Sequence, residues 1–109
     1  MAALAQEKLA KDVVIFDMQP VCSYTDFLVV CTGNSTRQTK AIFDEVHVQL
    51  KQENGVIPSS VAGEREATWI VADYLDVVLH VFTPQAREFY GLDDLWGDVP
   101  HERLEALSA

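Results

Sequence analysis

Four side chains that could do chemistry stand in one short stretch of the chain: Trp69, Asp73, Asp76 and His80. An imidazole can act as a general acid or base, and two nearby carboxylates can hold divalent metal ions. Nucleotidyl-transferring enzymes that use two Mg²⁺ ions place two carboxylates, separated by one residue, on a single strand so that their oxygens converge. Asp73 and Asp76 stand instead at the ends of two predicted strands. We therefore expect no metal site here.

The other nucleophiles, bases and metal ligands are scattered along the chain. His47, His80 and His101 are far apart and fall on different predicted elements, and no serine or cysteine lies in a nucleophile-elbow motif. Cys22 and Cys31 are nine residues apart, without a Cys-x-x-Cys motif or a histidine pair, so a zinc site is not expected. The sequence thus predicts a protein that is not an enzyme, with no catalytic residues, metal or cofactor.

Residues 68–82 predict a β-hairpin that positions these side chains. Two runs rich in β-branched and aromatic residues flank Tyr74 and Leu75, which we take as the loop. In this register three cross-strand pairs share the side of the hairpin that carries Trp69, which we call the Trp69 face: Trp69 with His80, Val71 with Val78, and Asp73 with Asp76. The other side is wholly apolar and predicts core: Ile70, Ala72, Val77, Leu79 and Val81.

The composition of the Trp69 face favours a docking site. An apolar centre with a charged margin is typical of protein interfaces, and a basic partner would relieve the repulsion between Asp73 and Asp76. The same residue types equally allow Trp69 and Val78 to be covered by the protein's own helix or by a second copy of the chain. Tight hairpins prefer glycine or asparagine in the turn, and a slip of one residue would exchange the two sides.

Length, charge and hydropathy narrow the class of protein. The 109 residues predict a single domain. Eight basic against seventeen acidic residues give a formal charge of -9, which disfavours direct nucleic-acid binding and allows a basic protein partner. No apolar run approaches the roughly 20 residues that span a bilayer, and the N-terminus lacks a signal-peptide pattern. We expect a soluble cytoplasmic protein, in which Cys31 is a buried, reduced thiol.

The remaining elements are predicted from periodicity and capping signals. Helices are expected at residues 2–11, 35–54 and 83–90. Ser35 and Gln38 form a capping box, Gly55 suits the end of that helix, and Thr83 caps the next. Further strands are expected at 13–16, 27–32 and 57–61, and residues 101–109 should form a frayed or weakly helical tail.

The order of these elements predicts the architecture. A strand at 27–32 followed by a long helix and more strands implies a right-handed crossover, so one later strand should run parallel to it. Residues 92–96 should form a turn that pins the C-terminal segment through its apolar side chains: Leu92, Leu95 and Trp96. We expect an α/β domain, more closely an α+β mixed sheet of about five strands with helices packed on it.

Three motifs resemble those of the ribosomal silencing factors, also called the Iojap-related or DUF143 family. They are C-T-G-N-S-T-R-Q at 31–38, W-I-V-A-D-Y-L-D-V-V-L-H-V-F at 69–82 and R-E-F-Y-G-L-D-D-L-W-G-D at 87–98. Their order and spacing match over nearly the whole chain, from residue 4 to 100, and the last two are the specific ones. The family usually has glycine where this chain has Leu75, a departure that concerns the turn.

The resemblance implies a fold, a partner and a mechanism. It implies a small α/β domain similar to nucleotidyltransferases but without their active site. Such proteins bind the large ribosomal subunit through ribosomal protein fourteen, where the small subunit docks, and so repress translation when nutrients are scarce. Carried over by motif, the partner-binding residues would be Trp69, Asp73, Tyr74, Asp76, Val78 and His80.

Two other functions stay open at this point. A self-associating structural module could pair the same apolar patch with its copy in a homodimer, the commonest symmetric assembly. A degenerate nucleotidyltransferase-like protein could still bind a nucleotide, although similarity of fold is a weak warrant for function.

Overall fold

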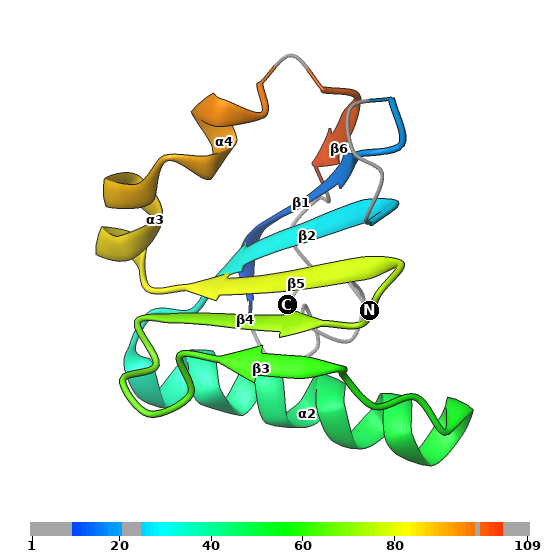
Figure 1. The fold of residues 1–109 in the computed structure, drawn as a ribbon. Helices are drawn as coiled ribbons and strands as arrows, with labels where there is room; N and C mark the ends of the chain where they lie inside the picture. Colours follow the sequence, from blue (N-terminus) through cyan, green and yellow to red (C-terminus); the bar gives the residue numbers. More distant parts are fainter. Residues whose placement is uncertain (1–9, 21–24, 98, 104–109) are drawn as a thin grey trace.

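The computed structural model describes residues 10–20, 25–97 and 99–103. Within them, one sheet has the strand order β3-β4-β5-β2-β1-β6, with helices on both sides (Figure 1). The strands are β1 (Lys11–Asp17), β2 (Phe27–Thr32), β3 (Ser60–Ala62), β4 (Trp69–Asp73), β5 (Val77–Phe82) and β6 (His101–Arg103). β2 and β5 are parallel and the other pairs antiparallel. This mixed α/β sheet confirms the predicted fold class and the crossover onto a parallel strand.

The long helix α2 (Thr36–Asn54) has the ends that the capping signals predict. The Gln38 backbone N–H donates to the Ser35 hydroxyl at 3.2 Å, and the Asn34 N–H donates to the Gln38 side chain at 2.7 Å. At the other end Gly55 takes the left-handed conformation, with φ of 66°. Because both ends are satisfied by neighbouring residues, the local sequence is enough to fix the length of the helix.

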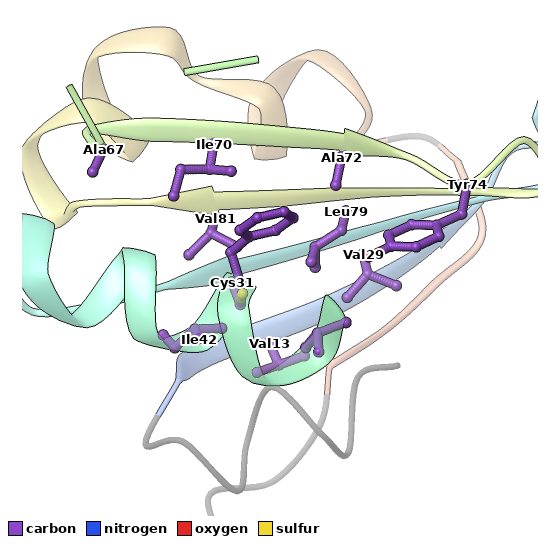
Figure 2. Close-up of a cluster of buried hydrophobic side chains, with 12 residues drawn as sticks. Val13, Val29, Cys31, Ile42, Ala67, Ile70, Ala72, Tyr74, Leu79 and Val81 are labelled. Carbon is purple, nitrogen blue, oxygen red and sulfur yellow. The ribbon is translucent and has the colours of Figure 1, made fainter. Parts of the chain in front are cut away.

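One hydrophobic cluster fills the space between α2 and the sheet. Figure 2 shows Ile70 and Ala72 of β4 and Leu79 and Val81 of β5 on the side that faces the helix, which contributes Ile42. Other buried members include Val13, Val29, Cys31, Phe43 and Val46. The side of the hairpin predicted to be core is therefore core, and Cys31 is buried as expected.

Two short helices, α3 (Pro84–Tyr90) and α4 (Leu92–Leu95), lie on the opposite side of the sheet from α2 (Figure 1). Beneath them a second cluster contains Val14, Phe16, Met18, Leu28, Val30, Val78, Phe82 and Val99. Leu92 and Trp96 pack against this cluster, as predicted, whereas Leu95 is 66% exposed and does not. The Trp69 face thus looks away from the long helix and toward the shorter pair.

Three predicted elements differ from the structure. Of the helix predicted at 2–11, residues 2–9 lie outside the described residues, and Lys11 already belongs to β1. The strand predicted at 57–61 is instead the shorter β3, because Pro58 cannot donate to a ladder. β6 adds a strand where a frayed tail was expected, by pairing with the edge of β1; residues 104–109 lie outside the described residues.

No helix in the described part of the chain combines the length and the apolar character that spanning a bilayer requires.

Candidate docking surface

The β4–β5 hairpin has a register different from the predicted one. Its partners on the Trp69 face are Trp69 with Phe82, Val71 with His80, and Asp73 with Val78. The predicted pairing is therefore wrong by two positions. A shift of two residues leaves each side chain on its predicted side, because side chains alternate with a period of two. The Trp69 face consequently keeps Trp69 and His80 together, gains Phe82 and loses Asp76.

The shift follows from a loop wider than a two-residue turn. Leu75 has φ of 73°, a left-handed conformation that glycine adopts without strain. The Asp73 carboxylate accepts a hydrogen bond from the Leu75 N–H at 2.8 Å, and the Tyr74 N–H donates to the Val77 carbonyl at 2.9 Å. The aspartate therefore stabilises a turn for which the residue at position 75 is not itself well suited.

Two of the six predicted partner-binding residues lie off the Trp69 face. Asp76 is an exposed loop residue whose carbonyl accepts a hydrogen bond from the Asp26 N–H at 2.9 Å. Tyr74 is buried in the cluster between α2 and the sheet (Figure 2), and burial raises the pKa of its hydroxyl. The predicted cross-strand pair of Asp73 and Asp76 does not form. Repulsion between them therefore no longer argues for a basic partner.

Trp69 lies at the centre of an aromatic assembly on the Trp69 face. Its indole is half-buried and stacks with Phe82, with ring centroids 5.1 Å apart. The Tyr90 ring of α3 lies at 4.4 Å, and the His80 ring at 5.9 Å. The indole Nε1–H donates to His80 Nδ1 at 3.0 Å. The sequence allowed the protein's own helix to cover Trp69. This is true in part, because the short helix α3 covers some of the Trp69 face, whereas the long helix α2 does not.

The apolar surface continues from Trp69 through Tyr90 onto Phe89, two residues that the sequence patterns did not single out. Phe89 is 82% exposed and Tyr90 50% exposed, and their rings meet edge to face with centroids 5.1 Å apart. Leu95 of α4 is also largely exposed. Helices this short show no clear amphipathic period, and the only sequence signal was the R-E-F-Y-G-L motif itself. Exposed aromatic pairs beside a half-buried tryptophan are typical of interface centres.

Away from the Trp69 face, the described residues include a cavity and a buried thiol that bear on chemistry. A cavity of about 360 Å³ lies where the parallel strands β2 and β5 end, at the edge where open α/β sheets bind ligands. The Arg87 guanidinium in its lining is already hydrogen-bonded to the Asp93 carboxylate and the Thr32 hydroxyl. No three His, Cys, Asp or Glu side chains of the described residues are grouped to hold a metal ion. Burial raises the pKa of the Cys31 thiol to about 12, so it is not a ready nucleophile.

The fold and this surface together define a small mixed α/β domain. Its distinctive feature is a tryptophan-centred apolar surface, opposite the long helix, with carboxylates nearby. Comparisons with known proteins then identify the family. The family model described as "Ribosomal silencing factor during starvation" matches residues 1–109. The chain belongs to the ribosomal silencing factor family, which confirms the resemblance drawn from its three motifs.

Individual relatives and solved structures agree with this assignment. The ribosomal silencing factor RsfS of Bacillus subtilis is 39% identical over 104 residues, covering 95% of this chain and 87% of that protein. The mouse protein named mitochondrial assembly of ribosomal large subunit protein 1 is 29% identical over 101 residues, 88% of this chain and 43% of that protein. A crystal structure from Chromobacterium violaceum has a TM-score of 0.83 and 32% identity, covering 98% of this chain and 87% of that one.

Proposed function

We propose that this protein silences ribosomes by docking the Trp69 face on the large ribosomal subunit, against its protein fourteen, and thereby preventing the small subunit from joining. Family membership supports the silencing role. The name of the mouse relative refers to assembly of the ribosomal large subunit, which supports the choice of subunit. The observation that carries the docking role is the half-buried Trp69 ring in contact with the half-exposed Tyr90 ring, which in turn meets the exposed Phe89 ring.

The charges around this surface indicate a basic partner. Asp73 stands at one end of the Trp69 face, and the exposed Glu88 and Asp94 adjoin Phe89 and Leu95 along the chain. The chain as a whole has a formal charge of -9. Charge complementarity of this kind speeds association and selects partners, while the aromatic centre supplies most of the binding free energy. Ribosomal proteins are typically basic, so one of them fits.

The proposed mechanism is steric and needs no turnover or cofactor. The domain measures about 30 Å in each direction. A body of this size, bound where the small subunit docks, overlaps the volume that the small subunit must occupy. Translation is repressed in proportion to the fraction of large subunits that are occupied. Under nutrient limitation the cell would raise the fraction of large subunits that carry the protein.

Sedimentation with purified large subunits tests the docking surface. Trp69→Glu is expected to abolish co-sedimentation, because a charge replaces the aromatic centre of the surface. Ile57→Glu is the control for adding a carboxylate at an apolar position elsewhere, since Ile57 is an exposed residue (62%) in the segment that follows α2. Circular dichroism should show both variants folded. If the Trp69 variant still pellets with the subunits, the proposed face is wrong.

Subunit joining tests the mechanism separately. Adding the protein to separated subunits in a sucrose gradient should reduce the whole-ribosome peak, and the Ile57 variant should do the same. Binding to large subunits without any loss of whole ribosomes would contradict the steric mechanism while leaving the docking surface in place.

Self-association through the same surface is a second candidate, favoured by the exposure of Phe89, Tyr90 and Leu95 on one side of the molecule. A homodimer of this kind would compete with the ribosome for one surface. Light scattering over a concentration series should show a mass that rises with concentration and falls to that of the monomer in Phe89→Ser. A monomer mass at every concentration would exclude this candidate.

A further inference from the structure

Trp69 and His80 are diagonal neighbours on the Trp69 face. In the β4–β5 ladder Trp69 is paired with Phe82 and His80 with Val71, so the indole and imidazole reach each other across the strands. The indole Nε1–H donates to His80 Nδ1 at 3.0 Å, and the two rings are stacked with an interplanar angle of 26°. The hydrogen bond fixes the rotation of the indole within its own plane, whereas ring stacking alone would leave that rotation free.

This contact determines the protonation state of the imidazole. An indole nitrogen can only donate a hydrogen bond, so the nitrogen that it meets must carry a free lone pair. A neutral His80 with its proton on Nε2 meets this requirement. Protonation of Nδ1 would set two N–H donors against each other and break the contact.

The surroundings of His80 maintain the neutral form. The side chain is 9% exposed, and burial lowers its pKa from 6.5 to about 4. Its strand neighbours are Val71 on β4 and Val30 on β2, both apolar. Two titratable side chains belong to the elements packed around it: Tyr90 of α3, which meets Trp69 and Phe82, and Asp73, which lies at the end of β4 on the Trp69 face.

We propose that His80 is a positioning residue, whose neutral imidazole accepts the indole hydrogen bond and so fixes the orientation in which Trp69 meets its partner. This role rests on the proposed docking function and refines it. His80 acts on the partner through Trp69, and its imidazole is not a cation that attracts an acidic group. It follows that docking should not depend on protonation of His80 across the physiological range.

Nuclear magnetic resonance of the free protein tests the hydrogen bond without any ribosome. The ¹⁵N spectrum should show His80 protonated at Nε2 only, and the Trp69 indole resonance should stay unchanged from pH 8 to pH 6. Trp96→Phe identifies which indole signal belongs to Trp69. A His80 ring that titrates near 6.5, or one protonated at Nδ1, would overturn the proposal.

Two substitutions test the positioning role. His80→Leu removes the acceptor and keeps much of the volume, whereas His80→Asn places an amide oxygen near the former Nδ1. His80→Leu is expected to lose the indole signature and to weaken binding to large subunits about tenfold, on the scale of one hydrogen bond. His80→Asn should restore both. If His80 had a purely structural role, His80→Leu and His80→Asn would both lose binding to large subunits to the same extent.

The outcomes separate this proposal from the docking function. If the indole hydrogen bond is lost in His80→Leu and affinity for large subunits is unchanged, the positioning role is overturned and the docking function stands. If the unmodified protein does not bind large subunits, the docking function fails, and the positioning role fails with it. If His80→Leu does not fold, His80→Asn alone is compared with the unmodified protein. A His80→Asn variant that folds but binds large subunits more weakly would overturn the positioning role.

Discussion

Arg87 and Asp93 form a two-pronged ion pair, with Nε 2.8 Å from Oδ2 and Nη2 2.9 Å from Oδ1. The third guanidinium nitrogen, Nη1, donates to the Asp12 carbonyl at 2.6 Å and to the Thr32 hydroxyl at 2.9 Å. The Arg87 side chain is only 10% exposed. One side chain thus joins α3 and the start of α4 to β1 and β2, and sets the position of the exposed rings of α3 relative to Trp69.

Arg87→Lys is therefore expected to weaken both stability and docking. Lysine keeps the charge but cannot make the planar, two-pronged contact or reach all the acceptors at once. We expect the free energy of unfolding to fall by roughly 2 kcal/mol, measured by urea denaturation, and large-subunit binding to weaken with it. Arg37→Lys, at an exposed position in the first turn of α2, is the control and should change neither. Unchanged stability in the Arg87 variant would show that this network is dispensable.

Phe89→Ser is expected to reduce binding to large subunits without destabilising the protein. Phe89 is 82% exposed, so its removal costs little packing, yet its ring meets the Tyr90 ring, which contacts Trp69. An interface anchor of this kind is worth about 2 kcal/mol, or about thirtyfold in affinity. Ile57→Ser, at another exposed apolar residue, should bind normally. Equal binding by the two variants would place Phe89 outside the interface.

Asp73→Asn tests the charge of the Trp69 face while keeping its geometry. The asparagine oxygen can still accept the hydrogen bond from the Leu75 N–H, so the loop should be preserved. Attraction to a basic partner is screened by salt, and the loss of affinity should therefore be several-fold at low salt and small at high salt. Asp44→Asn, on the exposed side of α2, is the comparison. A loss that does not change with salt would argue against an electrostatic contribution.

The buried His80 should make the protein less stable in acid. Its folded pKa of about 4 lies below the ordinary 6.5. Between these two values the unfolded chain binds the extra proton, so stability is complete above pH 6.5 and falls as the pH drops toward 4. The difference between the two pKa values corresponds to roughly 3 kcal/mol in the free energy of unfolding. Urea denaturation at several pH values should show a shallower decline in His80→Asn. Parallel curves for the two proteins would mean that His80 titrates normally.

The sequence by itself determined the features that depend on neighbouring residues. The ends of α2 followed from Ser35, Gln38 and Gly55, because each cap forms its hydrogen bonds within a few residues. The assignment of residues to the two sides of the hairpin followed from the alternation of side chains along a strand. A register shift of two residues does not change that assignment. For that reason Trp69 and His80 were placed together correctly, although the exact pairs were wrong.

The tertiary structure decided what depends on contacts between distant residues. β6 exists because β1 offers it an edge, and the Arg87 side chain meets a carbonyl 75 positions away. The Trp69 and Tyr90 rings meet only because α3 folds back over the sheet. No local pattern encodes these contacts, since each becomes favourable only after both segments have been positioned by the core.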